Sequence, residues 1–492
     1  MGGARYSTDS IRPPFCNSRL PAVAQFQEIE PVNSLDVFLP VPRVAAVLDP
    51  GFRPAVLARR AFAIQAQVPV RLAIEQADGS VFHQSTAILP AGHPHAAVNN
   101  FFVERLVKFL LWSRGGWRIW VDGPAELGDS LRQHYSEDAT GRFDSEIIGE
   151  RIYDRPIQIE TARELPPAKS STAPLGRHLD GCRIGFDLGG SDRKVAAVRN
   201  GEVVFSEETV WDPYFQADPQ YHIDGIQESL RQAAAHLPRV DAIGGSAAGV
   251  YVNNRVKVAS LFRGVSKDLF NSRVKDLFLE LRRAWDGIPF DVVNDGEVTA
   301  LAGSMSLGDN AVLGLSMGTS TAGGYVTPEG TITSWLNELA FTPFDYSPAA
   351  RRDEWSGDFG CGVQCFSQQA VGKLLAPAGI TVVAELPLPE KLKHVQQLMA
   401  AGDPRARMIY ETIGTYLGYG VAHLADFHTL RHVLVLGRVT SGIGGDIILS
   451  QAREVFRTEF PELVGQIALH MPDEKEKRHG QAIAAASLPI IP

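Results

Sequence analysis

The stretch that decides the fold is IGFDLGGSDRKVAAV, residues 184–198. Its first half alternates apolar residues as a strand does, Gly189-Gly190 permits a tight turn, and KVAAV runs back as a second strand. A turn of this kind points successive backbone N–H groups at one spot, where an anion can bind. The side chains suited to such a site are those of Asp187, Ser191 and Lys194. Taken alone, the stretch is equally consistent with an ordinary glycine-rich hairpin that has an Asp at its bend.

A second stretch, VLGLSMGTSTAGGYV, residues 312–326, has the same design. An apolar strand leads into Gly318-Thr319-Ser320, and a return strand follows. The similarity of SMGTS to the earlier DLGGS favours two related lobes that face each other, and two such loops are hard to explain as chance turns. We therefore predict that both loops bind phosphate, with Asp187 holding Mg²⁺ directly or through water, since hard cations prefer oxygen ligands.

A third stretch, FDVVNDGEVTALAG, residues 290–303, predicts a strand that ends at Asn294-Asp295 and a helix that begins there. A carboxylate at such a strand end faces a cleft in α/β folds. Asp295 could accept the proton of a substrate hydroxyl as that hydroxyl attacks a phosphoryl group. The alternative is that Asn294 or Asp295 only caps the helix, which is the commoner role for such a residue.

A fourth stretch, HVLVLGRVTSGIGGDIIL, residues 432–449, predicts a strand, a glycine-rich turn at Gly437 and a helix. Such a turn allows the backbone to approach a flat ring or a ribose closely. By itself a glycine-rich turn is weak support for a binding site.

The composition limits the classes of function. The net charge of −9 and the pI near 5.8 argue against non-specific nucleic-acid binding, which needs a basic surface. Four cysteines among 492 residues do not make a disulfide framework, so a reducing compartment is expected. No apolar run is long enough to span a bilayer and the N-terminal residues lack the apolar core of a signal peptide. We predict a cytoplasmic protein with no membrane partner.

The chain is long enough for two or three domains. The best linker candidate is ARELPPAKSSTAPLGRH, residues 162–178, because of its Pro and Ser content. The predicted parts are an N-terminal α+β domain of unknown role at 1–165, a linker at 166–178, a first lobe at 179–305 and a second lobe at 306–492.

Within the N-terminal segment, alternation on both sides of Asp78-Gly79 predicts a β-hairpin, and GGWRIWVDGP predicts another strand. NNFFVERLVKFLLW predicts a helix with Asn99 and Asn100 as caps. After the linker, strands alternate with helices, which favours an α/β architecture. One of these helices is expected to have Asp224 as its N-cap.

These stretches, in this order, resemble the actin-like sugar kinases, and most closely the ROK (repressor, open reading frame, kinase) family, which includes bacterial glucokinases. DLGGSDRK and GTSTAGGYV resemble the two phosphate motifs of the family, GGSAAGVYVNN its sugar-side loop, and VVNDGEVTALAG the segment with its catalytic Asp. The turn at Gly437 resembles its adenosine site. The resemblance covers roughly residues 180–490. It implies a two-lobed actin-like (ribonuclease H-like) ATPase fold of the α/β class, with an additional α+β N-terminal domain.

The resemblance also implies site residues. Asp295 would be the general base, and the substrate would contact Gly245, Asn294 and Glu338. ATP and Mg²⁺ would be the cofactors, with Mg²⁺ at Asp187. The nucleotide would contact Asp187, Gly189, Gly190, Ser191, Lys194, Gly318, Thr319, Ser320 and Gly437.

The sequence departs from the family pattern on the sugar side. Phe341 stands where the family has a His that binds sugar and, in many members, zinc. Of the cysteine-rich zinc loop only Cys361 and Cys365 are present, and a structural zinc site needs four ligands, so we predict no zinc. Ser367 or a neighbouring Gln replaces another sugar-binding Glu.

The leading hypothesis is an ATP- and Mg²⁺-dependent kinase that phosphorylates a hydroxyl of a hexose or a related sugar. A second hypothesis is a sugar-responsive transcription regulator with an N-terminal DNA-binding domain, and a third is a sugar or nucleotide sensor without kinase activity. The long N-terminal segment shows no clear basic helix-turn-helix, so we predict no nucleic-acid partner. The resemblance implies a homodimer, because members of the family often form dimers.

Overall fold

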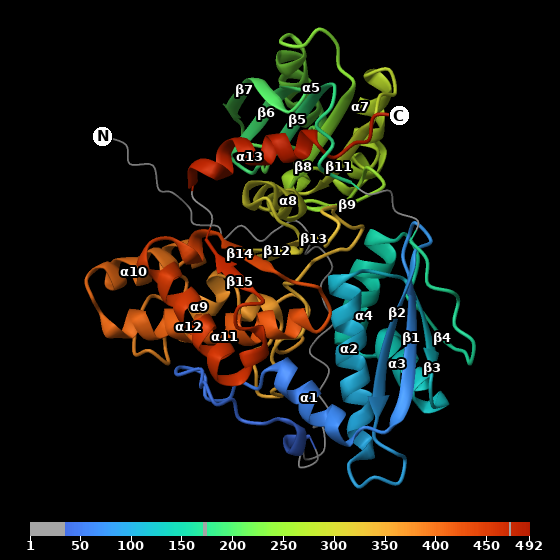
Figure 1. The fold of residues 1–492 in the computed structure, drawn as a ribbon, viewed down its shortest axis with the longest axis vertical. Coiled ribbons are helices and arrows are strands. Elements are labelled where there is room, and N and C mark those ends of the chain that lie inside the picture. Colours follow the sequence, from blue (N-terminus) through green and yellow to red (C-terminus); the bar gives the residue numbers. More distant parts are fainter. Residues whose placement is uncertain (1–34, 171–174, 472–473) are drawn as a thin grey trace, which may run out of the picture.

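The computed structural model describes residues 35–170, 175–471 and 474–492 (Figure 1). Its strands form one larger sheet in each of three regions, which we call the N-terminal unit (residues 35–161), the first lobe and the second lobe. The first lobe also contains a two-stranded sheet of β9 (Val250–Val252) and β10 (Arg255–Val258). No helix within the described part of the chain is long and apolar enough to cross a membrane.

The N-terminal unit contains a four-stranded sheet of order β2-β1-β3-β4. Its strands are β1 (Val68–Glu75), β2 (Val81–Ile88), β3 (Arg118–Asp122) and β4 (Gln158–Thr161), and its helices include α2 (Asn99–Ser113), α3 (Ala125–Glu137) and α4 (Ala139–Asp144). The hairpin around Asp78-Gly79 and the strand at GGWRIWVDGP are confirmed. The predicted helix is also confirmed, but its cap is wrong, because the Asn99 side chain bonds the backbone of Leu89.

The N-terminal unit shares a hydrophobic core with the second lobe. Helix α1 (Ala55–Gln65) lies against the second lobe (Figure 1), and the Ala55 N–H donates to the Phe344 carbonyl at 2.9 Å. One continuous buried cluster contains residues of both, from Leu35 to Leu469. The contact between the N-terminal unit and the second lobe is therefore buried away from water.

The first lobe contains a five-stranded sheet of order β11-β8-β5-β6-β7. Its strands are β5 (Cys182–Leu188), β6 (Asp192–Arg199), β7 (Glu202–Val210), β8 (Ala242–Ala247) and β11 (Phe290–Asn294). The first three are antiparallel, and β8 and β11 run parallel to β5. This order is the one expected of a ribonuclease H-like fold, so the predicted fold class is confirmed.

Two helices of the first lobe are α5 (Pro219–Ala234) and α7 (Leu277–Ala284). Helix α5 begins earlier than predicted: Asp218 is its N-cap and accepts from the Gln220 N–H, whereas Asp224 lies inside the helix. Asp218 directly precedes Pro219. Because proline favours the first position of a helix, Asp218 is better placed than Asp224 to cap α5.

The second lobe contains a four-stranded sheet of order β13-β12-β14-β15. Its strands are β12 (Val312–Met317), β13 (Thr321–Val326), β14 (His432–Leu436) and β15 (Ala468–His470), and its helices are α9 (Gln368–Leu374), α10 (Leu388–Ala400), α11 (Pro404–Ala425) and α12 (Ile443–Glu459). Helices α11 and α12 approach so closely that a side chain at Gly414 or Gly418 would crowd α12.

Two helices lie between the sheets of the lobes. Helix α8 (Asp295–Leu307) follows β11 and shares a buried cluster with β12, β13 and the C-terminal helix α13 (Glu474–Ala486). Helix α13 lies across the sheet of the first lobe (Figure 1). The predicted boundaries place all of residues 306–492 in the second lobe, whereas α13 packs on the sheet of the first lobe; those boundaries stay a prediction.

Glycines allow α13 to lie flat on that sheet. A side chain at Gly185 would collide with the Ala482 carbonyl, and one at Gly244 would collide with the Ala485 carbonyl. The buried Arg183 donates to the Pro489 carbonyl at 2.7 Å and fixes the chain end. Short-range patterns along the sequence do not reveal a contact between segments so far apart.

Candidate functional site

Asp187 lies at the end of β5, where the sheet register determines its neighbours. Ser246 is its partner on β8 and donates to Asp187 Oδ1 at 2.6 Å, and Lys194 is its partner on β6, with its Nζ atom 3.6 Å from Asp187 Oδ2. Burial raises the pKa of Asp187, although Ser246 and Lys194 act in the opposite direction. The carboxylate and hydroxyl oxygens form the kind of donor set that Mg²⁺ prefers.

Asp295 begins α8 directly after β11, as predicted. Asn294 caps the helix, because its Oδ1 accepts from the Gly296 N–H at 2.7 Å while its Nδ2 donates to the Gly249 carbonyl at 2.6 Å. The alternative interpretation of this pair thus holds for Asn294. The Gly296 N–H also donates to the carboxylate of Asp295, at 3.0 Å.

Glu338 belongs to a segment held by the N-terminal unit. The Glu338 N–H donates to the Trp112 carbonyl at 3.0 Å, and the Asn337 N–H donates to the Ser113 carbonyl at 2.9 Å. The last carbonyls of a helix have no partner inside the helix, so the C-terminus of α2 offers acceptors that this segment uses. Sequence reasoning missed this support for Glu338.

Asp295 interacts electrostatically with both Asp187 and Glu338. Burial, followed by the Asp187 charge, raises the pKa of Asp295 to about 6. Burial, followed by the Asp295 charge, raises the pKa of Glu338 to about 7. Asp295 of α8 thus lies within electrostatic reach of both Asp187 of β5 and Glu338 of the 333–342 segment. Perturbed carboxyl groups of this kind mark candidate sites of proton transfer.

The first glycine turn is formed as predicted but is occupied by its own acid. The Gly189 N–H donates to the Asp192 carbonyl at 2.9 Å. The Asp192 side chain accepts from the Ser191 hydroxyl at 2.9 Å and pairs with Lys194 at 2.9 Å. A phosphate group would compete with Asp192 for Ser191 and Lys194, a feature that the predicted set of residues did not include.

The second glycine turn lies beside the turn at Gly437. The Gly318 N–H donates to the Ser320 carbonyl at 3.0 Å, and Thr319 and Ser320 are exposed. Strands β12 and β14 are parallel neighbours, so Gly437 follows β14 next to Met317, where a side chain at Gly437 would crowd the Met317 backbone. Its φ of 105° also favours glycine. The structure thus brings together Gly318 and Gly437, which the sequence separates.

Gly245 does not suit a substrate-binding role. It is buried inside β8, and a side chain there would collide with the ring of Phe186. Gly249, beyond the end of this strand, is the glycine that lines a cavity. This glycine makes room for packing inside the sheet, and its predicted role as a substrate contact stays a prediction.

A cavity of about 270 Å³ lies beside the junction of β11 and α8, which carries Asn294 and Asp295. Its walls come from the turn of the β1–β2 hairpin, residues 249–254, strand β11 up to Asn294, residues 333–336, and the single residues Tyr153, Leu175 and Glu297. Neither Asp295 nor Glu338 is among its lining residues. The N-terminal unit thus contributes a wall next to the candidate site, which the sequence did not predict.

The residues that replace the sugar-side groups of the family have structural partners. The Phe341 ring packs against Trp112 and Phe143 of the N-terminal unit, with ring centroids 4.5 and 5.4 Å apart. Ser367 is fully buried, donates to the Val363 carbonyl at 2.6 Å and caps α9. Both positions therefore contribute to packing and capping.

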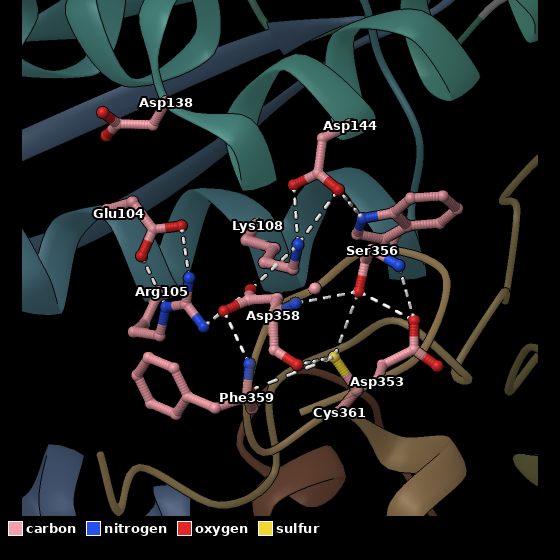
Figure 2. Close-up of polar contacts among 12 residues, drawn as sticks. Glu104, Arg105, Lys108, Asp138, Asp144, Asp353, Ser356, Asp358, Phe359 and Cys361 are labelled. Carbon is pink, nitrogen blue, oxygen red and sulfur yellow. Dashed lines mark hydrogen bonds and ion pairs between the residues drawn. The ribbon is translucent and has the colours of Figure 1, made fainter. Parts of the chain in front are cut away.

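Cys361 lies beside a buried ionic network that joins α2 to the 353–361 loop (Figure 2). Lys108 is fully buried and contacts Asp144 at 2.8 Å and Asp358 at 3.1 Å, and Arg105 contacts Asp358 at 2.9 Å. Cys361 and Cys365 are buried thiols, and no group of three or more potential metal ligands occurs among the described residues. The absence of zinc remains a prediction.

This arrangement defines an α/β protein with two lobes, each opening on a strand–glycine–strand turn. No family model and no curated protein matches the sequence. Among solved structures, the chain is similar to the ROK hexokinase from Thermus thermophilus, at 19% identity and a TM-score of 0.48, over 62% of this chain and 97% of that chain. It is also similar to a ROK-family glucokinase from Streptomyces griseus in complex with glucose and AMPPNP, at 20% identity and a TM-score of 0.44, over 61% and 98%.

A third similar structure is a ROK-family transcriptional regulator, a homologue of the E. coli MLC protein. Its identity is 19% and its TM-score 0.48, over 73% of this chain and 88% of that chain. Kinases and a regulator thus occur among the similar structures.

Proposed function

We propose that the protein is an ATP-dependent carbohydrate kinase, which transfers the γ-phosphoryl group of ATP to a hydroxyl of a hexose or related sugar. The observation that carries the proposal is the convergence of Asp187, Asp295 and Glu338 on the strand–helix junction at β11 and α8. A carboxyl group whose pKa is raised to about 6 is ionised at neutral pH yet basic enough to take a proton.

In this mechanism the sugar hydroxyl points at Asp295, which accepts its proton as the hydroxyl oxygen attacks the γ-phosphorus atom. The bond from that phosphorus atom to the β,γ-bridging oxygen breaks, and ADP leaves. Glu338 accepts hydrogen bonds from other hydroxyl groups and orients the sugar. Backbone N–H groups that follow Gly189 and Gly318 in the two turns hold phosphate oxygens, where they stabilise the charge that develops.

Mg²⁺ fits the oxygen donors at Asp187, as described above. When bound, it would neutralise charge on the phosphates. Lys194 would exchange its contact with Asp192 for one with phosphate. We also propose that the two lobes close on the substrates and exclude water, which limits ATP hydrolysis, and that the protein acts as a homodimer.

The test is ADP release with Mg²⁺-ATP across hexoses, amino sugars, N-acetylated sugars and ketoses, with Asp295→Asn as the control. Sugar-dependent release that the variant loses supports the kinase. Equal release by the variant contradicts the role of Asp295.

A second candidate, a sensor without kinase activity, is favoured by two observations. Phe341 packs against Trp112, and Asp192 holds Lys194, so both sides of the site differ from a simple sugar–phosphate site. Saturable sugar or nucleotide binding measured by calorimetry, with no ADP release from any sugar, would favour the sensor.

A further inference from the structure

Glu297 is a buried acid on α8, two residues after Asp295. Only 3% of it is exposed, and it has no place in the mechanism above. Its Oε2 accepts from the Tyr325 N–H of β13 at 3.2 Å, and its Oε1 accepts from the Asn337 side-chain amide. Glu297 therefore connects the helix that begins with the candidate base to two other segments.

Asn337, the residue before Glu338, is held on several sides. It is 1% exposed, its N–H donates to the Ser113 carbonyl at 2.9 Å, and its carbonyl accepts from the Gly323 N–H at 3.1 Å. Its φ of 48° lies in the left-handed region, which asparagine tolerates better than most residues. The amide bond to Glu297 thus fixes a backbone that is already restricted.

The two acids of the candidate site are linked through this pair. Helix α8 carries Asp295 at its start, and the first turn lies so close to β13 that a side chain at Gly324 would collide with the Gly296 carbonyl. Glu338 follows Asn337 directly. A shift of Asn337 relative to Glu297 would therefore change the position of Glu338 relative to Asp295.

We propose that Glu297 and Asn337 are positioning residues that set the placement of Glu338, and with it the substrate, relative to Asp295. This inference rests on the proposed function for its consequence in catalysis. The pair itself does not touch the reacting atoms. It acts through the backbone of residues 337–338, with the C-terminus of α2 as the opposing support.

The decisive variants exchange the carboxylate of Glu297 and the side-chain amide of Asn337 between the two positions. Asn337→Asp tolerates the left-handed backbone but places two carboxyl groups face to face. Adding Glu297→Gln restores an amide–carboxylate pair with its direction reversed: the glutamine oxygen accepts from the Tyr325 N–H, and its amide donates to the carboxylate introduced at position 337. The matched control is Asn200→Asp, at another left-handed asparagine (φ 50°), far along the chain in the β6–β7 turn.

Two readouts separate this inference from the proposed function. The first is kcat and KM of the kinase reaction, with ATP affinity measured separately. We expect Asn337→Asp to lower kcat at least about tenfold, the double variant to return it to within about threefold of the Glu297→Gln variant, and the control to leave it unchanged. A kcat unchanged in Asn337→Asp, or lost and not regained in the double variant, overturns the inference.

The second readout is hydrogen exchange of the Asn337 and Glu338 amides, which needs no catalysis. Exchange at these amides should accelerate in Asn337→Asp, return towards the wild-type rate in the double variant and stay unchanged in the control. If the wild type releases no ADP, the kinase proposal fails, and this pattern still decides the positioning role. Equal exchange in all variants overturns it.

Discussion

The backbone N–H of Glu338 donates to the carbonyl oxygen of Trp112 at 3.0 Å. The last turn of α2 therefore supports the segment that carries Glu338, a candidate substrate-binding residue. The Phe341 ring, three residues further on, packs against the indole of the same tryptophan. The N-terminal unit is thus part of the candidate site's framework. It also meets the first lobe, where Asp154 pairs with Lys275 at 2.9 Å.

The activity should depend on pH through the carboxyl groups of the site. Because the pKa of Asp295 is raised to about 6, this base loses its charge as the pH falls through that value, and its protonation should lower kcat/KM by a further factor of about ten per pH unit below it. The pKa of Glu338 is raised to about 7, so Glu338→Gln should remove an inflection near this pH and leave the lower one. A pH–rate profile checks this, and a flat profile between about pH 5 and about pH 8 would contradict it.

The buried ionic network should contribute strongly to stability. Asp358→Asn leaves Arg105 and Lys108 without a negative partner that they share, and breaking a buried pair costs about 3–5 kcal/mol. Urea denaturation measures this loss. Glu454→Gln, which removes an exposed pair with Arg457, is the control and should change the unfolding free energy by less than about 0.5 kcal/mol. Similar small effects of both variants would show that the network is dispensable.

The same network should give stability a dependence on acid. Burial alone would raise the pKa of Asp358, but the charges of Arg105 and Lys108 hold that pKa well below its usual range. A lowered pKa in the folded state means that its contribution is present above the unfolded value near 3.8 and is lost as the pH falls below it. Denaturation midpoints of the wild type and Asp358→Asn should therefore converge at low pH, and a constant difference down to the lowest pH would argue against this role.

Helix α13 should dock poorly when the glycines of the sheet beneath it are substituted. Gly244→Ala forces a methyl group into the Ala485 carbonyl and should destabilise the protein by about 1–3 kcal/mol or more. The matched control is Gly92→Ala, where no atom lies within 4 Å of the added carbon. Chemical denaturation and proteolysis near the C-terminus measure the effect. If Gly244→Ala behaves like the control, α13 does not lie on the sheet as described.

Local features could be predicted from the sequence because they depend on neighbouring residues. The turn at Gly189-Gly190 and the junction at Asn294-Asp295 follow from alternation, glycine and capping chemistry, and the structure contains both. The ribonuclease H-like fold class was implied by a family resemblance supported by such local motifs. The Pro219 that follows Asp218 is a local signal that favours Asp218 over Asp224 as the N-cap of α5.

Long-range contacts could not be predicted in the same way. Nothing near Glu338 indicates that its N–H meets the end of α2, and nothing near Gly185 indicates that α13 covers it. The sequence pattern places Gly245 in a glycine-rich loop, because it does not reveal that the Phe186 ring occupies the space beside this residue. The roles of the individual site residues and the domain boundaries stay predictions.

The central claim is phosphoryl transfer to a sugar with Asp295 as base, and its most direct test is detection of the product. Purified protein is incubated with Mg²⁺-ATP and the sugar that gives the highest ADP release, and sugar phosphate is measured by mass spectrometry beside ADP. We predict equal amounts of sugar phosphate and ADP from the wild type, and at least about 100-fold less of both from a folded Asp295→Asn variant. ADP without sugar phosphate, or undiminished sugar phosphate from Asp295→Asn, would contradict the account.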